Sequence, residues 1–293
     1  IGGSHLVRLS GSVANAGNIT ITDGANTGTV EMSGTGAQNI PILDVTQFGI
    51  LETGTKTAAG NITCSLDFGF TTNASNAVLD MQSHNLSAPI ALVANGVTGC
   101  QLITASISAS PIPAVNYPVG LKVVYGLNTG SEQFIPSGCV FSGGLEVVAS
   151  CPAKALGSIT IGGNLTLNGT LNMQSHQLLG TVSSFSGTGT LVSANTSSTP
   201  FPSGTYHSVT LDANANQTIP AVLLTGTLGL QGTGTKTASG NITDVGGFLA
   251  FSGSANLDMA THQIVGLTGS FSFTGTHLLR SACTTVLPFP DGL

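Results

Sequence analysis

The sequence repeats itself, and this constrains the fold of the chain more than any other feature. Residues 53–63 (TGTKTAAGNIT) and 233–243 (TGTKTASGNIT) agree at ten of eleven positions, at an offset of 180 residues. Shorter motifs divide this offset into two. A segment that recurs at a fixed period is typical of solenoids and other repeat architectures, in which each copy packs against the next.

Four shorter motifs mark the repeats in a constant order. They are Gln-x-Ile-Pro at 38–41, 133–136 and 217–220, Gly-Asn-[Ile/Leu]-Thr at 60, 163 and 240, Leu-[Asp/Asn]-Met-x-x-His at 79, 171 and 257, and Pro-x-Pro at 111, 200 and 288. Apart from the Gly-Asn motif, successive copies lie 84 to 95 residues apart. The repeat is therefore about 90 residues long. The chain contains about three copies, approximately 1–86, 87–178 and 179–264, with a partial fourth at 265–293, and 87–156 is the most divergent stretch.

Alternation of apolar and polar residues predicts that the repeats consist of β-strands. Leu165, Leu167, Leu171 and Met173 fall on one side of an extended chain, and the next copy repeats the pattern over 249–259. Such alternation is typical of half-buried strands. Asn-Gly, Ser-Gly and Thr-Gly pairs interrupt it at intervals that suit short turns. No stretch shows a helical period, so we expect almost no helix.

Two all-β architectures accommodate a repeat of this length. In a right-handed parallel β-solenoid with about 20 residues per turn, the 293 residues would give about 14 turns. Tandem β-sandwich modules of about 100 residues are the alternative. The solenoid is favoured because one motif occurs twice within one repeat, at 17–20 and 60–63, and because the chain has no Trp for an immunoglobulin-like core. We therefore predict one continuous β-solenoid over 1–293.

The low content of charged residues excludes several functions. Charged residues make up 6% of the chain, and six Lys and Arg against 12 Asp and Glu cannot form the basic surface that nucleic acids require. No apolar run approaches the roughly 20 residues of a membrane-spanning helix. In a solenoid, like charges would stack about 4.8 Å apart and repel one another, which gives the scarcity of charge a physical reason.

Four segments carry a family resemblance. Residues 34–41 (GTGAQNIP), 165–171 (LTLNGTL), 202–211 (PSGTYHSVTL) and 233–243 resemble the β-strand repeats of large bacterial secreted and surface proteins. These proteins are autotransporter-like or adhesin-like and are common in Bacteroidetes. The resemblance covers most of the chain and is weakest at 87–156. It implies a right-handed β-solenoid at the cell surface or outside the cell, with a scaffold or adhesive role, and it carries no catalytic motif.

We therefore predict a non-catalytic structural protein, a subunit or segment of an extracellular fibre in which solenoids stack end to end. His5-Leu-Val-Arg8 resembles His277-Leu-Leu-Arg280, which lies 272 residues later. No charged cap is apparent at either end, and an uncapped solenoid end offers unpaired strand edges to another copy. The candidate intermolecular contacts are His5, Arg8, His277, Arg280 and the odd cysteine, Cys283.

Three other functions remain open. An adhesin or glycan-binding module would use the divergent stretch 87–156, with Tyr117 and Tyr125 on an exposed binding loop. An ice-binding solenoid would present rows of Thr, of which Thr53-x-Thr-x-Thr57 and its copy at 233–237 are examples. A polysaccharide-degrading enzyme would need two carboxylates at one place.

The residues that perform catalysis or bind metals in other proteins are scattered thinly. Asp67 with Asp80, or Glu132 with Glu146, are the carboxylate pairs that adjacent turns would bring together. The three His of the Leu-x-Met-x-x-His motifs, at 84, 176 and 262, would lie about four turns, or roughly 19 Å, apart, which is too far for shared ligation. We therefore expect no catalytic residue, no metal and no cofactor.

Five cysteines leave two interpretations open. They lack a Cys-x-x-Cys spacing, so a zinc site is not indicated. In an extracellular chain Cys139 with Cys151, and Cys64 with Cys100, are candidate disulfides. The alternative is that all five are small buried hydrophobic residues.

Overall fold

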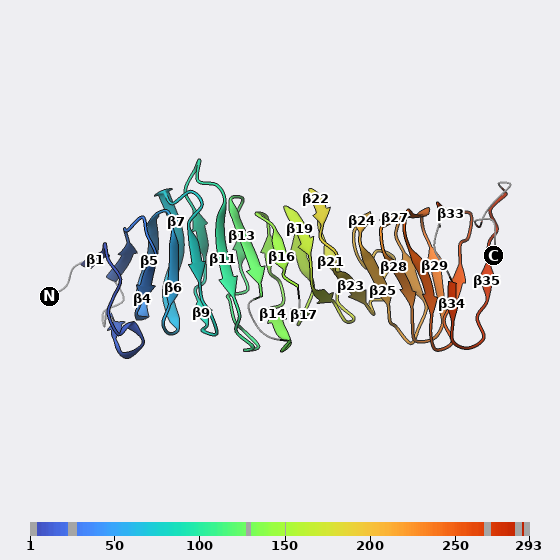
Figure 1. The fold of residues 1–293 in the computed structure, drawn as a ribbon, viewed down its shortest axis with the longest axis horizontal. Coiled ribbons are helices and arrows are strands. Elements are labelled where there is room, and N and C mark those ends of the chain that lie inside the picture. The colour runs from blue at the N-terminus through green and yellow to red at the C-terminus, as the bar shows by residue number, and fades with distance from the viewer. Residues whose placement is uncertain are drawn as a thin grey trace.

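The chain coils into a rod of stacked parallel strands, which confirms the predicted all-β solenoid. The computed structural model describes residues 5–22, 28–126, 130–149, 151–266, 271–284 and 289. The strand pairs of this part of the chain are parallel, and they stack in about 13 turns from one end of the rod to the other (Figure 1). Tandem β-sandwiches consist of antiparallel sheets, so that alternative is wrong. One turn of 3-10 helix, η1 (Ala16–Asn18), interrupts the strands near the start.

Each turn passes over three faces in the same order. Face 1 contains β2 (Thr20–Thr22), the first halves of β5 (Ile42–Glu52) and β7 (Ile62–Asn73), β9 (Leu86–Ser87), β14 (Gln133–Ile135), β17 (Pro152–Ala155), β20 (Thr170–Asn172), β23 (Thr190–Ser193), β25 (Ser208–Leu211), β28 (Thr227–Leu230), β31 (Phe248–Phe251) and β34 (Phe271–Phe273). Face 2 contains β1 (His5–Leu9), β3 (Gly28–Met32), the second halves of β5 and β7, β10 (Ala91–Val93), β12 (Asn116–Tyr117), β15 (Val140–Phe141), β18 (Ile159–Ile161), β21 (Leu178–Leu179), β26 (Gln217–Ile219), β29 (Thr235–Ala238), β32 (Asn256–Asp258) and β35 (Leu279–Arg280). Face 3 contains β4 (Gln38–Ile40), β6 (Thr55–Ala58), β8 (Val78–Asp80), β11 (Cys100–Thr104), β13 (Leu121–Tyr125), β16 (Leu145–Val147), β19 (Asn164–Leu167), β22 (Ser184–Ser186), β24 (Gly204–Tyr206), β27 (Val222–Leu224), β30 (Ile242–Asp244) and β33 (Ile264–Val265).

Side chains that point inward form columns along the axis of the rod. On face 3 one column runs through Leu79, Leu102, Val123, Leu145 and Leu165, which are in register and almost fully buried. Burial of one such side chain contributes about 1.5–3 kcal/mol to stability. Neighbouring residues in this column are 20 to 23 positions apart in the sequence, because the turns at the corners differ in length. The alternation over 165–173 and 249–259 therefore predicted the inward residues correctly.

The sequence repeat does not correspond to a whole number of turns. The equivalent residues Leu79, Leu171 and Leu257 lie in β8, β20 and β32, which belong to faces 3, 1 and 2. Twelve strands and one Pro-x-Pro segment lead from each of these positions to the next. These are 13 segments, and a turn consists of three, one on each face. One repeat therefore spans four and one-third turns, and each copy is rotated by one face relative to the copy before it.

The Pro-x-Pro segments take the place of a strand and hold a buried tyrosine. The Tyr206 hydroxyl donates to the Pro202 carbonyl at 2.8 Å, and the Tyr117 hydroxyl donates to the Pro113 carbonyl in the same way. Pro cannot donate a backbone hydrogen bond to the ladder. The side-chain bond four residues later fixes this part of each turn instead.

Candidate functional site

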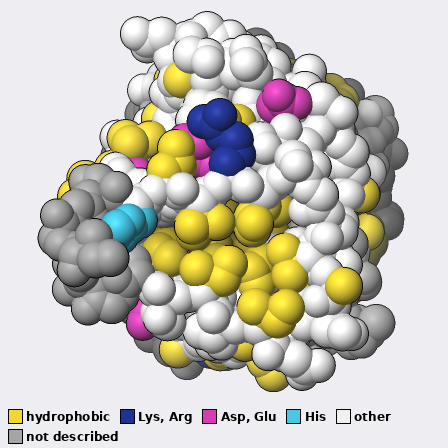
Figure 2. Space-filling view, turned by 90° about the vertical axis from the view of Figure 1, so that its left-hand side faces the viewer, with side chains coloured by type: hydrophobic (Ala, Val, Ile, Leu, Met, Phe, Trp, Pro, Cys, Tyr) yellow, Lys and Arg dark blue, Asp and Glu magenta, His cyan; other side chains and the backbone are white. Residues whose placement is uncertain are grey.

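The first turn of the rod exposes side chains that point inward elsewhere. Val7 is in register with Val30 and Phe48, which are buried, yet Val7 itself is 41% exposed. Val7, Ile21, Val30 and Val45 line a pocket of about 210 Å³ that also includes His5. Figure 2 looks along the rod onto this end and shows apolar side chains gathered at its centre. The core of the solenoid is therefore accessible at the first described turn.

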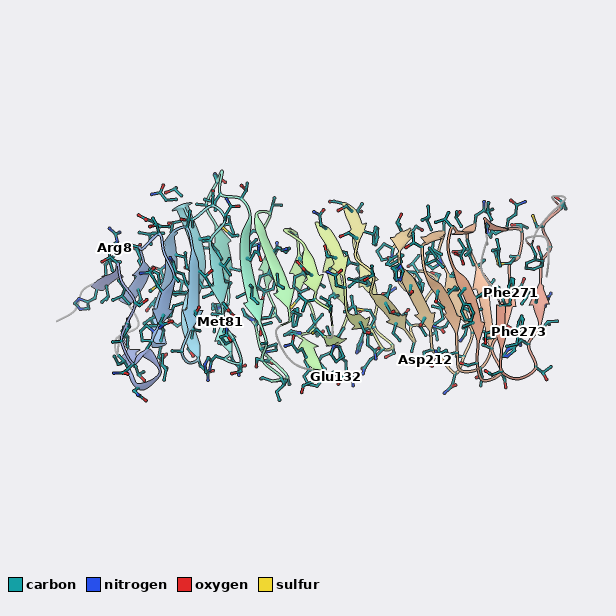
Figure 3. All side chains as sticks on the ribbon, in the orientation of Figure 1. Arg8, Met81, Glu132, Asp212, Phe271 and Phe273 are labelled. Atoms are coloured by element: carbon teal, nitrogen blue, oxygen red, sulfur yellow. The ribbon has the colours of Figure 1, made fainter. Side chains whose placement is uncertain are left out.

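The last described turn is open in the same way. Phe273 is in register with Phe251, which is 2% exposed, but Phe273 itself is 48% exposed. The rings of Phe271 and Phe273 lie parallel with their centroids 6.0 Å apart, at the opposite end of the rod from Arg8 (Figure 3). Both ends thus present apolar side chains in positions that an adjacent turn would cover.

The structure places four predicted contact residues at the two ends, on the same face. His5 and Arg8 lie in β1, while Arg280 lies in β35, the last strand of face 2, just after His277. Arg8 forms an ion pair with Glu31 on the next turn at 2.7 Å, and Arg280 lies 3.9 Å from Asp258. The His277 ring is 5.0 Å from that of Phe251, and its Nδ1 lies 2.7 Å from the Ala255 carbonyl oxygen.

The fifth predicted contact residue, Cys283, is half-buried near the same end. Its backbone N–H donates to Ser281 Oγ at 3.0 Å.

The most unusual polar groups are two lysines inside the rod. Lys56 and Lys236 occupy equivalent positions in two repeats, and both are fully buried. Lys236 Nζ donates to the carbonyls of Ala213, Ala215 and Thr233 at 2.7, 3.1 and 3.0 Å. Lys56 Nζ donates in the same way to Gly34, Gly36 and Thr53. A buried ammonium needs several hydrogen bonds to offset the loss of water, and here backbone oxygens of the corner supply them.

A glutamine lies next to each buried lysine on the preceding turn. Gln217 is in register with Lys236, and Gln38 with Lys56. Gln217 Nε2 donates to the carbonyls of Ser193 and Asn195, both at 3.0 Å, while its Oε1 accepts from the Ala213 N–H at 2.9 Å. Each Gln–Lys pair therefore satisfies the inward-pointing carbonyls of one corner over three successive turns.

The second repeat lacks this arrangement. Gln133 is in register with Ala153, and Lys154 beside it points outward to Glu132, 3.4 Å away. The buried Gln133 Nε2 has no hydrogen-bond partner among the described residues. A shift of one residue within a strand reverses the side of the sheet on which a side chain lies, which is why this lysine is on the surface.

Burial shifts the pKa of both inward lysines. Loss of solvation lowers the pKa of Lys236 to about 8, although attraction to the Asp212 carboxylate acts in the opposite direction and raises it. The same cause lowers the pKa of Lys56, opposed by Glu52. Sequence reasoning missed both residues, although the signal was present. In each segment Thr-Lys-Thr-Ala the lysine lies two positions before the inward alanine, so both side chains lie on the same side of the strand.

Tyr117 and Tyr125 do not form an exposed binding loop, so that prediction is wrong. Both side chains are fully buried, and the Tyr117 ring stacks on Phe141 at 5.4 Å. The buried Tyr125 hydroxyl has no hydrogen-bond partner among the described residues. Leu121, Val123 and Tyr125 alternate along β13, so the inward position of Tyr125 follows from the same period-two pattern as the rest of the core.

The predicted disulfides are also wrong. Cys64, Cys100, Cys139 and Cys151, which would form them, are buried free thiols. Burial raises the pKa of Cys64 and Cys139 to about 12 and that of Cys151 to about 11. These thiols serve as small apolar side chains of the columns, which is the alternative interpretation of the sequence.

The carboxylate pairs considered for catalysis do not meet. Asp67 lies on face 2 and Asp80 on face 3. Glu132 pairs with Lys154, and Glu146 pairs with Lys122 at 2.6 Å.

The three histidines of the repeat follow β8, β20 and β32 and therefore lie near three different faces. Within the described ranges, no group of three His, Cys, Asp or Glu side chains is arranged to hold a metal ion.

The Thr rows considered for ice binding are not continued over successive turns. Thr237 is in register with Thr218 on one side but with Asp258 on the other. Thr57 is in register with Asn39 and Asp80, and Asp80 is followed by Ile103.

Comparison of the chain with protein-family models, with curated proteins and with solved structures gave no match. In the part of the chain that the structure describes, no helix has the length and apolar character needed to cross a membrane.

Proposed function

We propose that the protein is a non-catalytic structural element, a subunit or segment of an extracellular fibre in which β-solenoid turns stack end to end. The observation that carries this proposal is the exposure of inward-facing side chains at both ends, Val7 at one and Phe273 at the other. Solenoids are normally closed by polar capping repeats. An open end offers apolar side chains together with unpaired strand edges, and both favour addition of another solenoid by parallel strand pairing.

The distribution of charge supports the same proposal. Arg8 with Glu31 and Lys122 with Glu146 are pairs of opposite charge on adjacent turns. Between charges about 4.8 Å apart along a stack, alternation of sign is favourable and repetition is not. The proposed location outside the cell rests on the resemblance of the repeats to those of secreted and surface proteins.

The proposal predicts heterologous contacts, in which the first turn of one copy meets the last turn of another. Size-exclusion chromatography with light scattering, together with negative-stain microscopy, should show rods that lengthen as the protein concentration rises. Val7→Asp or Phe273→Asp should each prevent lengthening, because each places a carboxylate on one joining surface. Val119→Asp, at a side chain that is 77% exposed away from both ends, is the matched control.

A mixture of the two end variants is the sharpest form of this test. Each variant retains one intact end, so a mixture of Val7→Asp and Phe273→Asp should form dimers and nothing longer. Wild-type protein that stays monomeric at every concentration would contradict the proposal. So would end variants that lengthen as the wild-type protein does.

A further inference from the structure

A groove on the side of the rod lies outside the two ends. It crosses β3, β5, β7 and β10 on face 2 and has a volume of about 410 Å³. This volume lies in the range of small-molecule sites, about 300–1,000 Å³. Two outward rows of residues define it, and each row follows the register of the strands.

One row contains no side chain at its centre. Glu31, Gly49, Gly69 and Leu92 are in register on four successive turns. The two glycines remove the side chains that would otherwise cover the sheet, so Phe48 and Phe70 contribute to the lining of the groove. Glu31 closes one end of this row and Leu92 the other.

Gly49 has no steric reason to be glycine. A Cβ at this position would meet Glu31 Cγ at 3.5 Å and Leu51 Cδ1 at 3.7 Å, which are ordinary contacts. Its backbone is not in the left-handed region. Glycine inside a strand costs about 0.5–1 kcal/mol relative to alanine. Such a glycine marks a bulge or the close approach of a ligand or another backbone, and the two register irregularities of β5 lie on either side of Gly49, between Val45 and Gln47 and between Ile50 and Glu52. The empty row is therefore a candidate binding surface.

The second row supplies hydrogen-bonding groups. Thr29 Oγ1 donates to Gln47 Oε1 at 3.1 Å, and Gln47 Nε2 donates to Asp67 Oδ2 at 2.9 Å. In the first row, Arg8 donates twice to Glu31 Oε2, at 3.0 and 2.7 Å. At the edge of the groove, Thr71 Oγ1 donates to the Ile50 carbonyl at 3.2 Å. Because these donors are engaged within the protein, the groove offers mainly acceptors, above all the second oxygens of Asp67 and Glu31.

We propose that this groove binds a saccharide that carries no acidic group. Hydroxyl groups of a sugar would donate to Asp67 and Glu31, while its C–H face would pack on the glycine row and on Leu92, which is 47% exposed. An acidic ligand is disfavoured because two carboxylates border the groove, and the guanidinium of Arg8 is already paired with Glu31. The site lies on the side of the rod, so binding is independent of end-to-end assembly.

The test is titration calorimetry of the full chain with cellohexaose, mannohexaose and chitohexaose. At least one of these neutral saccharides should bind, and Gly49→Val should weaken that binding at least tenfold by filling the groove. Two milder variants accompany it. Gly49→Ala adds a methyl group that fits without a clash, and Asp67→Asn removes the negative charge with almost no change in side-chain size. Gly11→Val is the control, because a side chain at Gly11 meets nothing within 4 Å.

Thermal unfolding should show that Gly49→Val is as stable as the wild type or more stable, since Val favours strands. Absence of binding by all three saccharides would overturn the proposal, as would unchanged affinity in both Gly49→Val and Asp67→Asn. Equal binding of polygalacturonate would overturn the exclusion of acidic ligands. Binding of spermidine in place of the saccharides would show that the groove recognises an amine instead.

Discussion

Gln217 and Lys236 are in register on adjacent strands, and together they donate to five backbone carbonyls at one corner of the rod. Among the described residues, no carboxylate is hydrogen-bonded to this ammonium group. Backbone carbonyl dipoles stabilise its charge instead. The same arrangement recurs at Gln38 and Lys56. The two Gln–Lys pairs are therefore expected to hold the corners of neighbouring turns in register.

Lys236→Met should destabilise the protein by about 3 kcal/mol, because three backbone carbonyls lose their donor, one from a buried and two from part-buried hydrogen bonds. Lys154→Met is the matched control, since that lysine forms a partly exposed ion pair and such pairs contribute about 1 kcal/mol or less. Urea unfolding at pH 7 would measure the difference. Equal losses in the two variants would show that the carbonyl contacts contribute nothing specific.

The contribution of Lys236 to stability should rise with pH. Its pKa is about 8 in the folded chain and 10.5 without burial, so between these values the unfolded chain binds more protons than the folded chain. Stability increases with pH wherever the unfolded state binds more protons. The free energy of unfolding of the wild type, relative to that of Lys236→Met, should therefore increase from pH 8 to pH 10.5. A difference that stays constant over this interval would contradict the lowered pKa.

Two tyrosines should respond in opposite ways to loss of the hydroxyl group. Tyr206→Phe removes a bond to the Pro202 carbonyl at 2.8 Å and should cost about 1 kcal/mol. Tyr125→Phe removes a buried hydroxyl that has no partner in the described structure. This change should be neutral or stabilising by up to about 1 kcal/mol. Thermal unfolding of the two variants measures both effects, and destabilisation by Tyr125→Phe would mean that its hydroxyl is satisfied.

The thiols should differ in reactivity according to burial. Cys283 should react with an aromatic disulfide reagent in the native protein at pH 7.5. Cys64, Cys100, Cys139 and Cys151 should react only after unfolding, because burial raises their pKa and excludes the reagent. A reducing agent should leave the melting temperature unchanged. A melting temperature that falls on reduction would instead indicate that disulfides form.

The period-two pattern predicted the strands and much of the core, and the motif that occurs twice within one repeat favoured the solenoid. It identified Leu165, Leu167, Leu171 and Met173 as inward residues, and all four are buried. The predicted number of turns, about 14, is close to the observed number of about 13. The inward positions of Lys56 and Tyr125 follow from the same alternation. These two inward positions were missed because the type of each residue was given more weight than its place in the alternation.

Other features were beyond the reach of the sequence. The rotation of each repeat by one face depends on turn lengths, which range from 18 residues between Val30 and Phe48 to 24 between Ile62 and Leu86. These lengths are set by the packing of the corners. The groove beside Gly49 depends on which residues are in register across four turns, and no pattern within one strand specifies that.

The rotation of the repeats has a mechanical consequence. A Pro-x-Pro segment interrupts the strand ladder, so a rod with every such segment on one side would be weakened there and would bend toward or away from that side. Here the segment at 111–113 lies on face 1, and the segment at 200–202, one repeat later, lies on face 2. Thirteen strand positions per repeat and three faces per turn share no common factor, so successive defects point in directions 120° apart. The bending moments of these two described segments therefore do not add along one side of the rod, and an imperfect repeat can still build an extended rod (Figure 1).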